Sequence, residues 1–443
     1  TFWPRSEDAS EGFQEKILTE FALLLFLGKR VSDKNSELEN HLDFAIKKID
    51  PLIRNRKNFE AILRRPSSCT TLGLGHIFLK AAGFGNADWD LLLEQAIGLG
   101  FDQLAERQPF RYLDSVWVNG LLGLPVPYNQ EDILPFSIFN SINHPAFMTV
   151  NDAYVFTHTL MYLTDFGKQN PGNGIQINKV QETINASILW QLSEENFDLL
   201  GEFLACHVFL NDAWNEYSGG AWRYLCTVWD RLSFLPGPAF EQEVFKQAGE
   251  QEKTAYAFKE TYHTNLVGAL LCIALLARKK TDAPIPPHET PESEIYRRIE
   301  KYLTELPDND TEYGVNPAFR NKSELIENIR KLIPHNSCKW LPMLIEGPNF
   351  ENEKIKRLLE LNLILSVRKY ELKILHESLL AYIEISGAPD YLMLTCLDFL
   401  AFQEFRSSPG SEKEDSSMKI ALLQAIQSMH NKWFSHRVTD ASI

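Results

Sequence analysis

The sequence predicts an all-α protein built as an array of antiparallel helical hairpins. Apolar residues recur every three or four positions, as on the buried face of a helix, for example at Phe13, Ile17, Phe21 and Leu24. The alternation of apolar and polar residues that marks strands is nearly absent. Proline and glycine break the pattern at short intervals, and short loops favour antiparallel neighbours. Such hairpins in series form either a closed α/α toroid or an irregular α-solenoid.

The same helical spacing continues toward the end of the chain, at residues 355–363 and 394–401. A change of composition lies between the two apolar parts: residues 279–294 read KKTDAPIPPHETPESE. Four prolines among polar residues predict a linker or loop at 281–294. We therefore expect a main helical domain at 1–280 and a C-terminal helical portion at 295–443. Whether the second part closes the same toroid is left open.

Composition excludes several classes of partner. The net charge is −15, and no long cluster of lysine and arginine is present, so neither nucleic acid nor an anionic membrane is an expected partner. The longest apolar run, Leu266–Ala277, has 12 residues, which is too short to span a bilayer. The six cysteines form no CxxC pair, and the first residues do not read as a signal peptide. We expect a cytoplasmic protein, and a homodimer stays open.

The segment Asn151–Gly167, NDAYVFTHTLMYLTDFG, is the most informative one for function. It predicts one helix with an N-cap at residue 151 or 152 and a glycine just past its end. His158 and Asp165 are seven residues apart with Tyr162 between them, so a helix places all three on one stripe. Thr157 lies beside this stripe. These groups can transfer protons or bind a ligand. The alternative is that the stripe faces solvent or that Asp165 bonds to backbone amides.

A second candidate is Glu202, in the apolar segment Asp198–Leu210. Spacing of four residues puts Asp198, Glu202 and Cys206 on one helical stripe. A carboxyl group among leucine and phenylalanine is partly desolvated, which raises its pKa as a general acid requires. The alternative is a glutamate on the solvent face of an amphipathic helix.

The third candidate is the pair Tyr262 and His263, which we expect to open the apolar helix at 266–277. Polar side chains in a first turn reach into the space that the helix end faces, and the free amides there favour an anion. The alternative is that His263 supports the helix cap. His158, Glu202, Cys206 and His263 could supply zinc ligands, but no local spacing such as HExxH supports this. We therefore predict neither a metal nor another cofactor.

Two of these segments resemble motifs of a known family. Residues 157–167 (THTLMYLTDFG) resemble a TH…FY.TDFG pattern, and residues 262–267 (YHTNLV) resemble YHTTLV, with Asn265 where threonine is usual. Both are similar to an uncharacterised bacterial all-helical family of the α/α toroid type, found in biosynthetic gene clusters. The resemblance covers about residues 90–405. It implies no particular reaction, but it implies that His158, Asp165 and His263 matter.

Two hypotheses follow. The chain is either an enzyme of bacterial natural-product biosynthesis, or a non-catalytic helical scaffold for a peptide or protein partner, which the acidic charge predicts to be basic. The enzyme would perform cyclisation, elimination or hydrolysis on a small or peptide-derived intermediate by acid–base chemistry. Its predicted catalytic residues are His158, Asp165, His263 and Glu202, and its predicted substrate-binding residues are Tyr162, Thr157, Tyr262 and Cys206.

Overall fold

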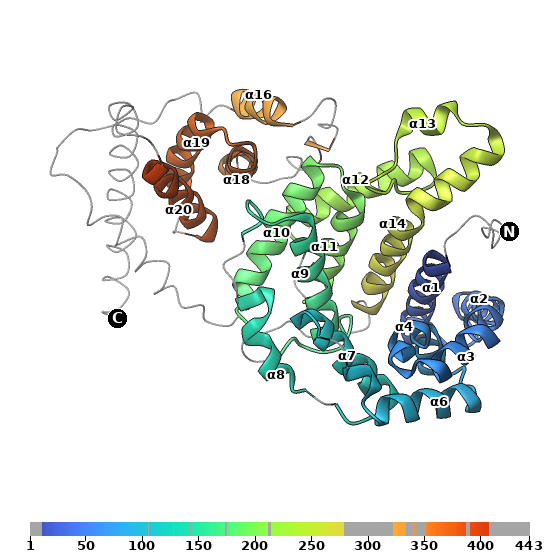
Figure 1. Cartoon of the computed structure of the whole chain (residues 1–443). Coiled ribbons are helices and arrows are strands. Elements are labelled where there is room, and N and C mark those ends of the chain that lie inside the picture. Colours follow the sequence, from blue (N-terminus) through green and yellow to red (C-terminus); the bar gives the residue numbers. More distant parts are fainter. Residues whose placement is uncertain are drawn as a thin grey trace, which may run out of the picture.

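In the computed structural model every described element is a helix (Figure 1), which confirms the all-α class. The structure describes residues 11–406 apart from 105, 127, 141–143, 173–174, 211–213, 279–321, 334–339, 342, 344–350 and 387–389. The predicted linker at 281–294 lies outside the described residues, so the domain boundaries stay a prediction.

The described helices fall on the two sides of residues 279–321. Short 3₁₀ turns at Pro66–Ser68, Phe101–Gln103, Leu134–Phe136 and Ile138–Asn140 join some of them. The first group is α1 (Glu11–Val31), α2 (Glu37–Ile53), α3 (Arg56–Arg64), α4 (Cys69–Leu72), α5 (Leu74–Ala81), α6 (Ala87–Gly98), α7 (Pro109–Leu122), α8 (Gln130–Ile133), α9 (Val150–Leu163), α10 (Ile177–Ser193), α11 (Phe197–Phe209), α12 (Glu216–Leu232), α13 (Gln242–Gln247) and α14 (Glu250–Arg278). The second group is α16 (Lys322–Leu332), α18 (Glu351–Lys369), α19 (Leu372–Ile385) and α20 (Tyr391–Arg406).

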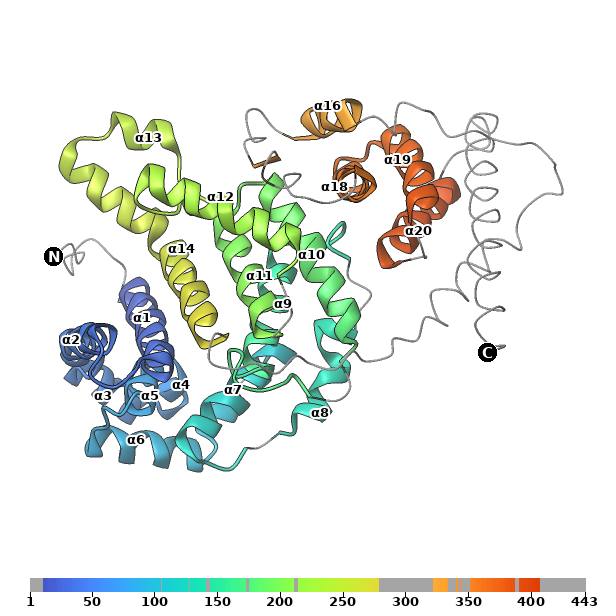
Figure 2. The same cartoon turned by 180° about the vertical axis from the view of Figure 1, so that it is seen from behind.

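Helices far apart in sequence close a circuit of neighbours. Helix α1 packs against α5, α5 against α7, α7 against α9, α9 against α11, α11 against α14, and α14 again against α1. Helices α2, α10 and α12 pack on members of this circuit, and Figure 2 shows α1 and α14 side by side from behind. The sequence left open a toroid or a solenoid, and that choice stays a prediction for the whole chain.

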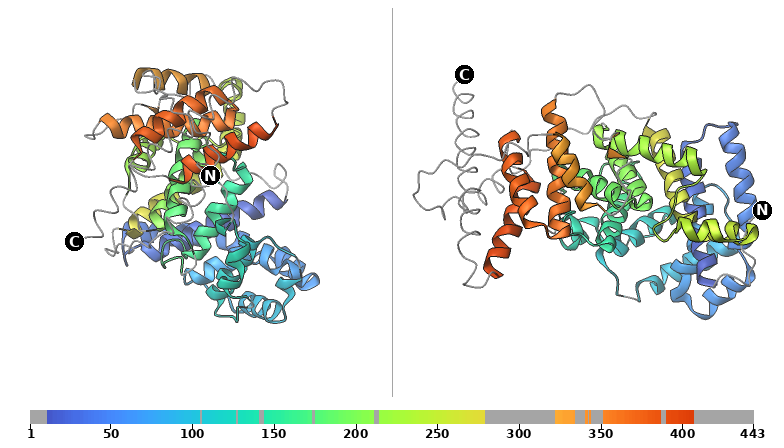
Figure 3. Two further views of the ribbon diagram at one scale, coloured as in Figure 1. Left: turned by 90° about the vertical axis from the view of Figure 1, so that its left-hand side faces the viewer. Right: turned by 90° about the horizontal axis from the view of Figure 1, so that it is seen from above.

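The C-terminal helices join the circuit through α10. In Figure 3, α16, α18, α19 and α20 lie at one end of the molecule and α1 to α6 at the other. Arg368 of α18 donates hydrogen bonds to the backbone carbonyls of Pro145 (2.8 Å) and Met148 (3.0 Å). Its guanidinium also lies 3.8 Å from the centre of the Trp190 ring, a cation–π contact. One partly buried arginine thus connects α18 to both α10 and the segment before α9.

Helix α11 is the most deeply buried helix of the circuit. All of its side chains from Phe197 to Phe209 are buried, which is the pattern of a core helix that is apolar nearly all round. At Gly201 it approaches α14 closely: a Cβ atom there would lie 2.7 Å from Cγ1 of Val267. The missing side chain therefore lets α11 and α14 pack together, one residue away from Glu202.

Helix α9 begins before the position that the sequence predicts. Its N-cap is Thr149 rather than residue 151 or 152, because Thr149 and Asp152 form a capping box. The Thr149 hydroxyl accepts a hydrogen bond from the Asp152 amide (3.1 Å), and the Asp152 carboxylate accepts one from the Thr149 amide (2.9 Å).

Helix α9 also ends earlier than predicted, and this moves Asp165. The backbone is left-handed at Asp165 (φ 46°) and at Gly167 (φ 83°), so both residues lie in the turn after the helix. The Asp165 carboxylate accepts hydrogen bonds from Trp117 Nε1 (2.6 Å) and Arg30 Nη1 (2.8 Å). The prediction that Asp165 shares a helical stripe with His158 is therefore wrong.

Helix α14 begins well before Tyr262 and His263, which the sequence predicted to lie in its first turn. It begins at Glu250, so His263 lies in its middle, where its neighbours' backbone amides are already bonded within the helix. The prediction of a free helix N-terminus at His263 is wrong. By length and apolar composition, the stretch Glu252–Arg278 could also cross a membrane, which is weak evidence because core helices pass the same test.

We expect Gly201→Ala to lower the free energy of unfolding by roughly 1–3 kcal/mol, because its methyl group would push against Val267. The measurement is urea denaturation followed by circular dichroism. Gly219→Ala in α12 is the matched control: its Cβ would lie 3.6 Å from the end of the Arg223 side chain, an ordinary contact. Alanine there is expected to be neutral or to add about 0.5–1 kcal/mol through helix propensity. Equal effects of the two substitutions would contradict the close approach of α11 and α14.

Candidate functional site

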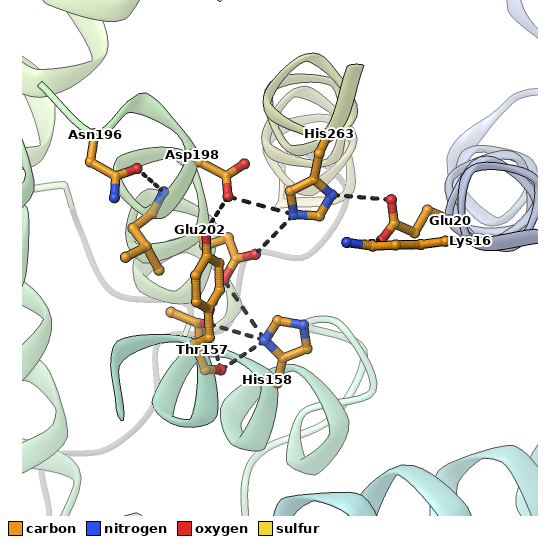
Figure 4. A network of polar contacts seen from close by, with 10 residues as sticks. Lys16, Glu20, Thr157, His158, Asn196, Asp198, Glu202 and His263 are labelled. Carbon is orange, nitrogen blue, oxygen red and sulfur yellow. Dashed lines mark hydrogen bonds and ion pairs between the residues drawn. The ribbon is translucent and has the colours of Figure 1, made fainter. Parts of the chain in front are cut away.

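Four polar side chains from α1, α11 and α14 meet on the inner side of the circuit (Figure 4). His263 Nδ1 is 3.1 Å from Glu20 Oε2. Its other ring nitrogen, Nε2, lies 3.5 Å from Asp198 Oδ2 and 4.0 Å from Glu202 Oε1. The imidazole therefore has carboxyl groups on both sides. We refer to Glu20, Asp198, Glu202 and His263 as the carboxylate–histidine cluster.

Helix α9 completes the cluster from the other side of Glu202. The Thr157 hydroxyl donates a hydrogen bond to Glu202 Oε2 at 2.5 Å, and His158 Nδ1 lies 3.8 Å from the same oxygen. His158 Nδ1 is also 2.7 Å from the carbonyl oxygen of Tyr154. A carbonyl can only accept, so Nδ1 carries the proton and the lone pair is on Nε2. Glu202 thus lies between two imidazoles.

Burial differs sharply between the two acids of α11 and the other groups of this site. Asp198 and Glu202 are 1% and 2% exposed, whereas the side chains of His158, His263 and Glu20 keep 30%, 31% and 24% of their surface exposed. The two imidazoles and Glu20 are therefore the groups of the site that solvent reaches most readily.

The pKa values follow from these surroundings. Burial, and then the charge of Asp198, raises the pKa of Glu202 to about 8. Burial alone would lower the pKa of His263, but the hydrogen bond with Glu20 and the charges of Asp198 and Glu202 outweigh it and raise the value to about 9. Desolvation lowers the pKa of His158. At neutral pH the two histidines thus differ in charge, which suits them to different roles.

Local structure holds Asp198 in place. Asn196 caps α11 by accepting a hydrogen bond from the Leu199 amide, so Asp198 lies in the first turn, where a negative charge interacts well with the helix dipole. The Tyr154 hydroxyl donates to Asp198 Oδ2 at 2.5 Å. The sequence prediction did not include Asp198, Glu20 or Tyr154 in the site. The four-residue spacing between Asp198 and Glu202 could have indicated that Asp198 belongs to the site. The local sequence around Glu20 contains no such signal.

The structure brings together three of the four residues predicted as catalytic: His158, Glu202 and His263. Asp165 is not among them, since its carboxylate bonds to Trp117 and Arg30 instead. Of the residues predicted to bind substrate, Thr157 contacts Glu202 directly. The ring of Tyr162 is tilted against those of Trp117 and His158, and Tyr262 packs against Phe13 and Phe258. Cys206 is fully buried, with its thiol 3.7 Å from the Thr157 carbonyl.

Comparison with known proteins gives a family but no reaction. A family model described as "Domain of unknown function (DUF6895)" matches residues 1–273. The chain belongs to this family. No curated protein and no solved structure matches it. The matched residues of this DUF6895 protein include the whole carboxylate–histidine cluster and His158, and the match agrees with the resemblance to an uncharacterised family.

The DUF6895 protein has a second group of acids, which is partly buried, where α12 meets α18 and α19. Tyr217 donates a hydrogen bond to Glu360, and the Tyr382 hydroxyl lies between Glu360 and Asp390. Burial raises the pKa of Glu360 to about 7. The sequence analysis did not predict this group.

The raised pKa of Glu360 predicts that stability falls as pH rises. The folded protein keeps a proton on Glu360 up to about pH 7, whereas the unfolded chain releases it near the ordinary value of 4.5. The folded state therefore binds more protons in this window, and the free energy of unfolding falls between about pH 4.5 and 7. Glu360→Gln should make this fall smaller in urea denaturation at a series of pH values. The exposed Glu371→Gln is the control, and an unchanged pH dependence in Glu360→Gln would contradict the assignment.

Proposed function

We propose that this DUF6895 protein is an enzyme that performs acid–base chemistry on a small or peptide-derived molecule at the inner side of the helical circuit. Cyclisation, elimination and hydrolysis are the reaction types that such chemistry serves. The earlier resemblance suggests that the substrate is an intermediate of bacterial natural-product biosynthesis.

One observation carries the proposal: a buried carboxyl group lies between two partly exposed imidazoles. His158 and His263 approach opposite oxygens of Glu202, at 3.8 Å and 4.0 Å. Proton transfer needs a donor and an acceptor within reach of one reacting atom, and α9, α11 and α14 hold these groups around one space. A purely structural role would not need two imidazoles near solvent beside one buried acid.

The geometry supports a distinct role for each residue. His158 has its lone pair on Nε2, because Nδ1 donates to the Tyr154 carbonyl, so it is the proton acceptor. Glu202, whose Oε2 accepts from Thr157, is the acid of the pair. His263, held by Glu20, places a positive charge where negative charge develops on the substrate.

The scaffold hypothesis remains the second candidate, and the exposed large apolar side chains would serve it. They include Phe136, Leu99 and Leu104, which are 79%, 74% and 72% exposed. They lie on different elements, and none of them lies in the carboxylate–histidine cluster. The buried cluster therefore supports the enzyme more directly than these residues support a scaffold.

A test that needs no prior substrate compares metabolites. Cell extracts from a natural host, or small-molecule libraries, are incubated with the wild-type protein, with Glu202→Gln and with His158→Gln, and mass spectrometry follows the products. We expect at least one product that forms with the wild type and falls by about a hundredfold or more in both variants, the usual loss when an acid or a base is removed.

Glu371→Gln, the same change at an exposed position, should leave the product unchanged, and circular dichroism should show that each variant is folded. Full product formation by folded His158→Gln and Glu202→Gln would overturn the proposed roles. A wild-type protein that converts nothing but retains a peptide or protein would instead support the scaffold.

A further inference from the structure

We propose that Asp198, Glu202 and His263 bind a divalent transition-metal ion, with Glu20 and Tyr154 as the partners that orient two of these ligands. The inference rests on the proposed function only in that the ion and the proposed substrate would occupy the same site. It departs from the sequence-based expectation that the protein has no metal.

The ligand atoms are close to the arrangement that such an ion requires. One potential ligand atom from each of the three residues lies within 4.8 Å of the other two. The separations from His263 Nε2 are 3.5 Å to Asp198 and 4.0 Å to Glu202. An ion with bonds of about 2.0–2.2 Å keeps neighbouring ligand atoms roughly 3–3.5 Å apart. Small side-chain rotations toward the ion would therefore complete the contacts.

The surroundings of His263 match those of a metal-binding histidine. Such a histidine usually donates its second ring N–H to a carboxylate, which sets the tautomer and the ring orientation. Here Glu20 accepts from Nδ1, which leaves Nε2 for the ion. The Tyr154 hydroxyl likewise bonds to Asp198, and the Thr157 hydroxyl to Glu202. Each of the three ligands thus has an orienting partner.

The charge of the site also favours a cation. The carboxyl groups of Glu20, Asp198 and Glu202 surround one imidazole, and Lys16 reaches only the outermost of them, Glu20, at 3.7 Å. Asp198 is 1% exposed, and its Oδ1 has no hydrogen-bond partner among the described residues. A buried carboxylate oxygen without a donor is costly unless a positive charge approaches it. A divalent ion would supply that charge once His263 has released its Nε2 proton to bind the ion.

The donor set indicates the class of ion. One imidazole and two carboxylates suit zinc, manganese or iron better than calcium or magnesium, which prefer oxygen alone. Three protein ligands leave positions open for water or substrate, as in catalytic rather than structural sites. With the ion bound, Glu202 and a neutral His263 would be ligands, and the ion would supply the acid and the positive charge that these two residues provide without it. His158, whose Nδ1 is held by Tyr154, keeps its role as proton acceptor.

The experiment is isothermal titration of Zn²⁺ into the full chain after treatment with a chelator, with Mg²⁺ as a comparison. We expect one tightly bound Zn²⁺ per chain and much weaker Mg²⁺ binding. Asp198→Asn and His263→Gln should each weaken Zn²⁺ binding at least a hundredfold. Glu20→Gln, which removes only the orienting partner, should weaken it by about 10–100-fold.

Two controls separate this inference from the proposed function. His41→Gln removes an exposed imidazole of α2 and should leave Zn²⁺ binding unchanged. His158→Gln should also keep Zn²⁺ binding, although the proposed function expects it to lose activity. Zn²⁺ should further raise the melting temperature of the wild type but not of Asp198→Asn.

Wild-type binding weaker than about 0.1 mM would overturn the inference, and so would unchanged binding in folded Asp198→Asn and His263→Gln variants. If those two variants do not fold, Co²⁺ absorption decides: the visible bands of the wild-type complex must change in Glu202→Gln, and unchanged bands would overturn the inference.

Discussion

The burial of two carboxyl groups on α11 is the constraint on which the rest of the site depends. Asp198 and Glu202 are almost without solvent, in a helix whose other side chains form the core. Buried carboxyl groups must be protonated, hydrogen-bonded or paired with a positive charge. Their neighbours meet this need: α9 supplies two hydroxyl groups, and α14 supplies an imidazole that a glutamate of α1 holds in place.

This arrangement makes the circuit of helices necessary for the proposed chemistry. Each helix contributes one or two polar groups, and none of them could form the site alone. The close approach at Gly201 lets His263 reach both acids of α11. Catalytic groups must be held within a few tenths of an ångström, and packed helices do this better than loops. The packing of the helices in the core therefore sets the distances between the acidic and basic side chains of the cluster.

The sequence predicted the helical class and the desolvation of Glu202, because both are visible in local spacing. It also predicted His158 and His263, although His263 was expected at a helix end. The residues from 250 to 262 are rich in glutamate, lysine and alanine, which favour helix, so an earlier start of α14 could have been predicted. Asp165 could not have been placed, because two consecutive non-glycine residues with positive φ leave no mark in an apolar pattern. Glu20 was beyond local reasoning, since its partner is 243 residues away.

That separation has a consequence for how the protein is made. During translation α1 leaves the ribosome long before α14 is synthesised. Glu20 therefore has no contact with His263 while α2 to α13 are being made. The carboxyl groups of α11 also emerge before the helix that neutralises them. A chain that stopped short of residue 263 would lack the histidine that lies beside both carboxyl groups of α11. We therefore expect the site to be complete only after α14 has packed against α1 and α11, and incompletely folded chains of this kind expose surface that chaperones bind.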